Sequence, residues 1–180
     1  MLFRSNILKA IKFAKEKHKS QTRKYNNRPY IVHPARVSTR VMLFDDVTEE
    51  QICAAWLHDT IEDCKVTPSE IACLFGGEFG ESVAKLVVEL TNPSKNVKAP
   101  RAVRKQMDRD HLKEVSFYAK RIKLVDRLDN CLELEGADSD FIGLYITETK
   151  ALLSVIGDAV PELSEEILEQ LKRLEAKIDY

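Results

Sequence analysis

The chain has 180 residues, of which 44% are hydrophobic and 32% charged, and its formal net charge is −1. This balance is typical of a globular protein with a sizeable core, and it argues against a disordered chain or a strongly basic nucleic-acid-binding domain. The longest unbroken apolar run, from Ile52 to Leu57, is far too short for a transmembrane helix. The N-terminus lacks the apolar segment of a signal peptide, so we expect a cytoplasmic protein that does not bind a membrane. Nucleic acid is not expected as a partner, because the chain is not basic overall and has no recognisable nucleic-acid-binding motif.

The small net charge hides an uneven distribution along the chain. Residues 1–28 carry nine lysines and arginines and the single acid Glu16, a net charge of +8. Residues 133–180 carry twelve acids and four bases, a net charge of −8, which solvated helix faces explain. The basic segment continues through the loop-like sequence SQTRKYNNR, where helix packing does not explain it. It therefore predicts a site for an anion.

Apolar residues recur at helical spacing along almost the whole chain, and no segment alternates convincingly with the period of two expected of a strand. Helices are predicted around 7–14, from Pro34, after capping boxes at 48–51 and 67–70, and over about 78–90, 101–114, 116–134, 139–157 and 164–178. The breaker-rich sequence TNPSKNVKAP, residues 91–100, is predicted to be a loop. We therefore predict an all-α fold, with a single domain over residues 1–180 built as a bundle of roughly eight helices.

Cysteines and histidines are few and scattered. The four cysteines form no CxxC pair, and most lie in apolar segments, which favours reduced thiols over disulfides or a zinc site. Two of the four histidines, His18 and His111, have charged neighbours, and we expect both at the surface.

The sequence AAWLHDTIEDC, residues 54–64, places a histidine and three acids at the end of an apolar run. On a continuous helix, His58, Asp59, Glu62 and Asp63 fall within about 140° of one face, so they point into the protein or a cleft. Three carboxylates held together repel one another unless a cation shares their site. The alternative is a frayed helix end with solvated acids, but acids at a helix C-terminus oppose the helix dipole.

A metal site needs partners from elsewhere in the chain. His33, in RPYIVHPAR, stands just ahead of a predicted helix, and Asp126 interrupts the apolar pattern of AKRIKLVDRLDNC. Lys123 and Asn130 share the helix face of Asp126, so taken alone this acid reads as a salt-bridged helix aspartate. Combined with the HD pair it becomes a candidate fourth ligand. Two imidazoles and two carboxylates suit Mn²⁺, Fe²⁺ or Zn²⁺ and leave positions for water and substrate.

This pattern of a histidine, an HD dipeptide and a distant aspartate resembles the HD-domain metal-dependent phosphohydrolases. The resemblance is closest to the hydrolase domain of RelA/SpoT-type alarmone enzymes and to the stand-alone small alarmone hydrolases, including the metazoan SpoT homologue. Four segments carry it, in order: RKYNNRPYIVHPARV, AAWLHDTIEDC, LFGGEFGESVAKLVVELT and IKLVDRLDN. It is strongest over residues 5–155, and residues 156–180 add a C-terminal helix. The HDxxED form is typical of the members that hydrolyse.

The resemblance implies a role for each matching residue. One Mn²⁺, or another divalent ion, would be bound by His33, His58, Asp59 and Asp126. Glu62 and Asp63 would order and deprotonate the attacking water. The implied contacts to the guanine nucleotide are Arg23, Lys24, Lys123, Asn130 and, by a looser alignment, Tyr145. Residues 92–109 depart most from the family pattern.

The implied substrate is guanosine 3′,5′-bis(diphosphate) or its pentaphosphate. Water would attack the phosphorus on the ribose 3′ oxygen, release pyrophosphate and leave GDP or GTP. One alternative is another nucleotide phosphohydrolase with the same metal set, such as an NADPH 2′-phosphatase or a deoxynucleotide phosphatase. The other is a non-catalytic nucleotide sensor, which predicts erosion of the ligand set or of Glu62 and Asp63, and neither is eroded here. A homo-oligomer is possible, but nothing in the sequence indicates one.

Overall fold

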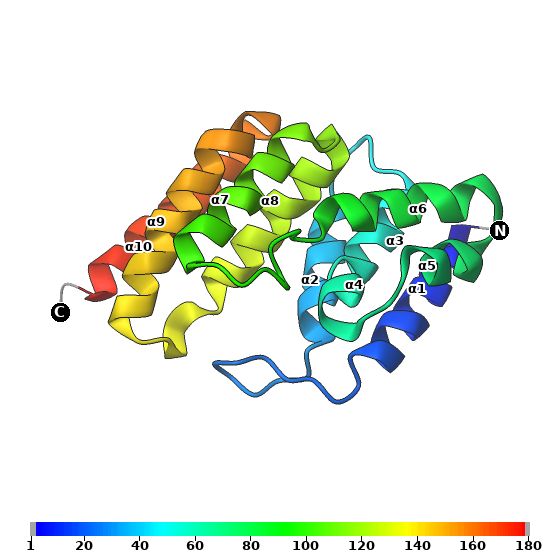
Figure 1. Ribbon diagram of the computed structural model, residues 1–180, viewed down its shortest axis with the longest axis horizontal. Coiled ribbons are helices and arrows are strands. Elements are labelled where there is room, and N and C mark those ends of the chain that lie inside the picture. Colours follow the sequence, from blue (N-terminus) through cyan, green and yellow to red (C-terminus); the bar gives the residue numbers. More distant parts are fainter. Residues whose placement is uncertain (1–2, 179–180) are drawn as a thin grey trace. The chain divides into compact units, whose positions relative to one another are not determined.

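The computed structural model describes residues 3–178 (Figure 1), and side chains are described for all of these except 3–4, 135 and 178. The described part contains ten α-helices, two short 3-10 helices and no strand, so the predicted all-α fold is confirmed. Its only β pairing is a single antiparallel bridge between Thr22 and Pro29. The ends of the predicted domain, residues 1–2 and 179–180, lie outside the described residues. None of the described helices combines the length and the apolar composition that a bilayer span requires.

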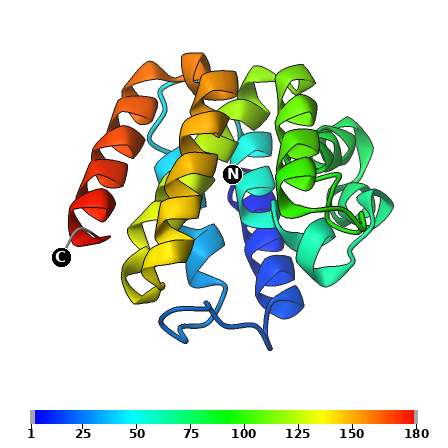
Figure 2. The same ribbon diagram turned by 60° about the vertical axis from the view of Figure 1, so that its left-hand side comes forward.

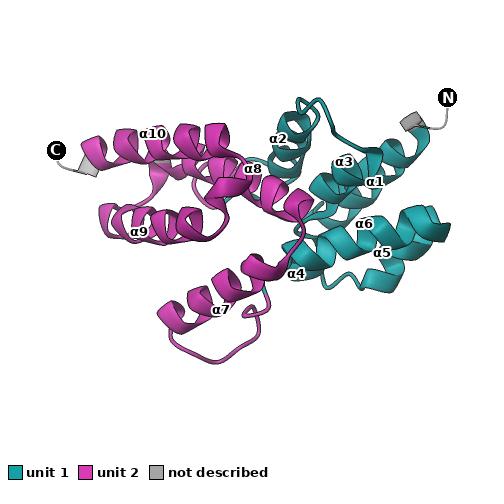
Figure 3. Ribbon diagram, turned by 90° about the horizontal axis from the view of Figure 1, so that it is seen from above, with its two compact units in different colours: residues 1–23, 28–92 teal, residues 24–27, 93–180 magenta. Residues whose placement is uncertain are grey.

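The chain divides into two compact units (Figure 3). Unit 1 comprises Met1–Arg23 and Arg28–Asn92, and unit 2 comprises Lys24–Asn27 and Pro93–Tyr180. Four residues at the tip of the first loop therefore belong to unit 2, although the chain on both sides of them belongs to unit 1. A single domain over the whole chain remains a prediction.

Unit 1 is built around one apolar helix. Its helices are α1 (Phe3–Lys17), α2 (Val32–Val41), α3 (Glu49–Leu57), α4 (Thr60–Cys64), α5 (Pro68–Phe75) and α6 (Gly77–Leu90). Helix α3 packs against α1, α2 and α6, and its residues Cys53, Ala54 and Leu57 are fully buried. This burial on several sides agrees with a sequence that is apolar nearly all round. The buried helix α3 thus fixes the position of His58 and Asp59, which follow its last turn.

The helix starts show which local signals act as predicted. The capping box at Thr67 is confirmed, because its hydroxyl accepts from the Glu70 N–H and Glu70 accepts from the Thr67 N–H. The capping box at Thr48 is wrong: Thr48 is the N-cap, but its side chain bonds no helix N–H and instead accepts from the Gln51 side chain at 3.4 Å. Helix α2 begins at Val32, so Pro34 lies at its third position and not its first.

Unit 2 is a group of longer helices. They are α7 (Arg101–Glu114), α8 (Phe117–Leu132), α9 (Ser139–Ile156) and α10 (Pro161–Ile178), with 3-10 turns at Leu134–Gly136 and Gly157–Ala159. Helix α10 packs on both α8 and α9, and the two C-terminal helices run side by side in Figure 2. Leu124 and Leu128 of α8 and Leu171 of α10 are fully buried. Helix α8, which carries Asp126, is therefore the core helix of unit 2.

All four cysteines are free thiols, in agreement with the predicted reduced state. Cys53 and Cys131 are buried, Cys64 is half-buried and Cys73 is exposed. Burial raises the pKa of Cys64 and of Cys131 to about 11, which keeps both thiols protonated at neutral pH.

Candidate metal centre

The HD dipeptide lies at a break between two helices and not within one helix, so the expectation of a continuous helix through residue 63 is wrong. Helix α3 ends at Leu57, and α4 begins again at Thr60. Side chains take up carbonyls of the last turn of α3: the Thr60 hydroxyl donates to Leu57 O at 2.7 Å, and His58 Nδ1 bonds Ala55 O at 2.8 Å. These bonds satisfy carbonyls that a continuing helix would have used.

The hydrogen bond from His58 to the Ala55 carbonyl also determines the tautomer of its ring. A carbonyl oxygen can only accept, so Nδ1 of His58 carries the hydrogen, and the neutral ring presents the lone pair of Nε2. Metal-binding histidines are held in the same way, with the second nitrogen donating to a backbone carbonyl or a carboxylate. His58 is only 3% exposed, so its Nε2 faces a buried site.

Three potential ligand atoms gather at this point in unit 1. Nε2 of His58 lies 3.2 Å from Nε2 of His33 and 2.9 Å from Oδ2 of Asp59, and the distance from His33 Nε2 to Asp59 Oδ2 is 3.6 Å. An ion with bonds of about 2.1 Å separates adjacent ligand atoms by about 3.0 Å in an octahedron and about 3.4 Å in a tetrahedron. Such a cluster of lone pairs requires a positive charge, from a proton on an imidazole or from a metal ion. The residues present fit a divalent ion.

Tyr30 supports this cluster, and sequence reasoning missed it. Its hydroxyl donates to Asp59 Oδ2 at 2.6 Å, and its backbone carbonyl accepts from the His33 N–H at 2.9 Å. The ring of His18 stacks on that of Tyr30 with centroids 4.8 Å apart. His18 is therefore not at the surface as predicted: it is 2% exposed, and its Nδ1 lies 2.6 Å from Gln21 Oε1. Tyr30 lies three residues before His33 in RPYIVH, and this position is the sequence feature that could have indicated a role beside the ligands.

The two candidate bases lie on the short helix α4. Glu62 Oε2 accepts from both the backbone N–H of Asn92 at 3.2 Å and its side-chain amide at 2.9 Å. The backbone of Asp63 is bonded at both groups, because its N–H donates to Asp59 O at 2.8 Å and its carbonyl accepts from the Gln21 amide at 3.4 Å. Both acids are half-buried. Although the helix is interrupted, Glu62 and Asp63 follow Asp59 within one turn, as the sequence predicted.

In unit 2, Asp126 forms a compact polar group on α8. Lys123 Nζ lies 2.9 Å from Asp126 Oδ2, and Asn130 Nδ2 donates to Asp126 Oδ1 at 2.6 Å. Asp126 is 5% exposed and Lys123 8%. The structure thus brings together three predicted site residues of this helix, and it balances the charge of Asp126 within the helix itself.

The remaining substrate candidates lie beside aromatic rings. The guanidinium of Arg23, in unit 1, lies over the Tyr30 ring at 5.4 Å. Lys24 belongs to unit 2, where its ammonium lies 4.9 Å from the Tyr25 ring and 5.1 Å from the Phe141 ring. The two adjacent basic residues therefore have separate surroundings, which their sequence did not indicate.

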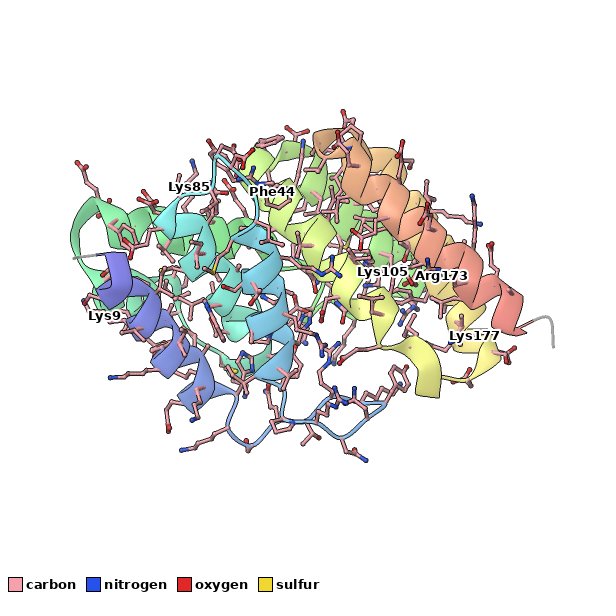
Figure 4. The ribbon with its side chains drawn as sticks, turned by 180° about the vertical axis from the view of Figure 1, so that it is seen from behind. Lys9, Phe44, Lys85, Lys105, Arg173 and Lys177 are labelled. Atoms are coloured by element: carbon pink, nitrogen blue, oxygen red, sulfur yellow. The ribbon has the colours of Figure 1, made fainter. Side chains whose placement is uncertain are left out.

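Tyr145 and Lys105 lie among the bases of unit 2. Tyr145 is on α9 with the Arg127 guanidinium 4.7 Å from its ring, and desolvation of the phenol holds the pKa of Tyr145 above its ordinary value. On α7, burial and the nearby charge of Arg127 lower the pKa of Lys105, which is labelled in Figure 4. Arg127 of α8 thus affects both side chains, because its guanidinium lies against the Tyr145 ring and its charge lowers the pKa of Lys105.

Several known proteins are similar to this chain in sequence. Residues 10–157 match the HD domain family. A Xenopus tropicalis protein named guanosine-3′,5′-bis(diphosphate) 3′-pyrophosphohydrolase MESH1 is 37% identical over 131 residues, which cover 72% of this chain and 69% of that protein. A Mycoplasma pneumoniae protein named as a probable enzyme of the same activity is 30% identical over 160 residues, 86% of this chain and 21% of the relative.

A solved structure is also similar. It is described as a metazoan ortholog of SpoT that hydrolyzes ppGpp and plays a role in starvation responses. It matches with a TM-score of 0.81 and 27% sequence identity, over 93% of this chain and 94% of that chain.

Proposed function

The chain belongs to the HD domain family, and from this premise we propose that it is a metal-dependent hydrolase of guanosine 3′,5′-bis(diphosphate) or its pentaphosphate. The reaction removes pyrophosphate from the ribose 3′ position and leaves GDP or GTP. Support for the substrate comes from the names of the similar proteins. Support for the chemistry comes from the residues themselves.

We propose that His33, His58 and Asp59 of unit 1 and Asp126 of unit 2 bind one divalent ion, with Mn²⁺ as the first candidate. The distances among the first three support this assignment. Asp126 is supported by its position in the family motif and by its burial. When bound, such an ion lowers the pKa of a water molecule and offsets the negative charge of the phosphoryl group.

Glu62 and Asp63 are proposed to carry the proton transfer. Glu62 takes a proton from the attacking water, whose oxygen bonds to the phosphorus attached to the ribose 3′ oxygen. The bond between that phosphorus and the 3′ oxygen breaks, and the 3′ oxygen takes up a proton. One water is consumed, and its oxygen leaves in pyrophosphate. Asp63, the next residue on α4, is proposed to orient the water.

The basic residues are proposed to bind the nucleotide. The Arg23 guanidinium lies over the ring of Tyr30, and the Tyr30 hydroxyl bonds the proposed ligand Asp59. Tyr30 therefore contacts both this cation and the ligand cluster. Lys24, Lys123, Asn130 and Tyr145 are the other proposed contacts. An excess of bases over residues 1–28 supplies positive charge for a strongly anionic ligand.

The observation that carries the proposal is the cluster of His33, His58 and Asp59 with Glu62 one turn further on. The test is to incubate the protein with ppGpp and Mn²⁺ in ¹⁸O-water and to quantify the products. We expect GDP and pyrophosphate in equal amounts, with the label in pyrophosphate and not in the 3′ hydroxyl of GDP. Early orthophosphate without pyrophosphate would indicate cleavage of a terminal phosphate. Rapid dephosphorylation of NADPH without ppGpp cleavage would overturn the substrate but not the metal chemistry.

A further inference from the structure

Glu62, the proposed base, is held by a residue of the loop that follows α6. Asn92 donates two hydrogen bonds to the same carboxylate oxygen, Glu62 Oε2: one from the side-chain amide at 2.9 Å and one from the backbone N–H at 3.2 Å. The two residues are 30 positions apart, so the contact is made by the fold of unit 1 and not by local sequence. An ionised carboxylate only accepts, which fixes the amide with its nitrogen towards Glu62.

The chain around Asn92 is itself fixed. The hydroxyl of Thr91 donates to Val87 O at 2.8 Å, and the Thr91 N–H bonds Val88 O at 3.1 Å, so the last turn of α6 holds the start of the loop. Asn92 is also the last residue of unit 1. Its two donors therefore project from a defined end of a helix, and they reach a side chain that otherwise has several rotatable bonds.

We propose that Asn92 is a positioning residue for hydrolysis, which holds the Glu62 carboxylate in the orientation that takes the proton from water. This inference rests on the proposed function, because it assigns no role to Asn92 other than through Glu62. A base acts efficiently only when held close to its productive geometry by neighbouring hydrogen bonds. Charge-assisted bonds of this kind are among the stronger ones in proteins.

The side chain and the backbone of Asn92 can be separated by substitution. Asn92→Ala removes the side-chain donor but keeps the backbone N–H, so we expect kcat to fall about tenfold while KM changes less than about twofold. Asn92→Asp keeps the shape but places a second carboxylate against Glu62, and kcat should fall further. Asn92→Gln retains an amide donor and should recover most of the activity lost in Asn92→Ala.

Thr91→Val is the matched control, since it removes a side-chain hydrogen bond at the adjacent position without touching Glu62. It should lower thermal stability slightly and lower kcat by less than about twofold, because the Thr91 N–H still bonds Val88 O and holds the start of the loop. Mn²⁺ affinity, measured by calorimetry, should be unchanged in Asn92→Ala because none of the proposed ligands is altered. An equal loss of kcat in Thr91→Val and Asn92→Ala would assign the effect to the loop as a whole and overturn the inference.

A double-mutant cycle provides the decisive measurement. In a Glu62→Gln background, Asn92→Ala should lower kcat by less than about twofold, because its effect passes through the base that has been removed. A further tenfold loss in that background would contradict the inference. If the wild-type protein hydrolyses no nucleotide, the proposed function fails. Urea unfolding of the wild type, Asn92→Ala, Glu62→Ala and the double variant then decides whether Asn92 holds Glu62, because Glu62→Ala removes the acceptor. Coupled changes in the midpoint support the contact, and additive changes refute it.

Discussion

Asp59 in unit 1 and Asp126 in unit 2 are both proposed metal ligands, yet their surroundings differ. Asp59 accepts from the Tyr30 phenol and faces the Nε2 atoms of His58 and His33. Asp126 is held by the Lys123 ammonium and the Asn130 amide on its own helix. Asp59 is thus bonded by a neutral phenol, whereas Asp126 is bonded by a charged ammonium and an amide. An acid in a metal motif can therefore stabilise its own unit as well as bind the ion.

Asp59→Ala should produce the largest effect. It removes one proposed ligand while His33 and His58 remain, and we expect bound metal and hydrolysis to be lost together. Metal analysis of the purified protein and a turnover assay check this. Without metal, the free energy of unfolding should fall by about 1–3 kcal/mol, because the Tyr30 hydroxyl loses Asp59 as its acceptor. Normal metal content with normal turnover in this variant would refute the assignment of the site.

Asp126→Ala should mainly lower the stability of the fold. It leaves the Lys123 ammonium buried without its partner, so the free energy of unfolding without metal should fall by about 3–5 kcal/mol. Urea unfolding with a chelator present measures this. The double variant Lys123→Met/Asp126→Leu should recover most of the stability, because neither charge is then left alone. If Asp126→Ala were as stable as the wild type, the ion pair would have no structural role.

Tyr30→Phe should weaken metal binding in unit 1 without removing a proposed ligand. It removes the hydroxyl that donates to Asp59 Oδ2 but keeps the ring that stacks on His18. Loss of a hydrogen bond to a ligand typically weakens metal binding by about 10-fold to 100-fold, and we expect the lower end because both imidazoles are unchanged. Titration of Mn²⁺ by calorimetry measures the change. An unaltered affinity would show that Tyr30 does not orient Asp59.

Helix caps and helix ends could be predicted from sequence where they depend on neighbouring residues. The capping box at Thr67 and the ends of most helices follow from signals within four residues, which are read directly. The break after α3 could not be predicted, because it depends on side chains of Thr60 and His58 bonding to carbonyls. The residues that hold the acids were also missed: Tyr30 is 29 positions from Asp59 and Asn92 is 30 from Glu62, so only the tertiary fold joins them.

The smallest predicted effect concerns the start of α5, and it sets the baseline for the stability measurements. Thr67→Ala removes a hydroxyl that accepts from the Glu70 N–H, and should lower the free energy of unfolding by about 1 kcal/mol. Thr48→Ala is the control: Thr48 is also an N-cap, but its side chain bonds no helix N–H, so its loss should cost less.

The same cap should give this baseline a pH dependence. The Thr67 backbone N–H, then Lys17, lower the pKa of Glu70 below its ordinary value. Because the folded pKa is the lower one, the stabilisation by Glu70 is present above its unfolded pKa of about 4.3 and is lost as the pH falls through the folded value. Glu70→Gln should therefore destabilise the protein at pH 7, and the difference from wild type should shrink as urea unfolding is repeated below about pH 4. A difference that stayed constant with pH would mean that Glu70 acts through its shape and not through its charge.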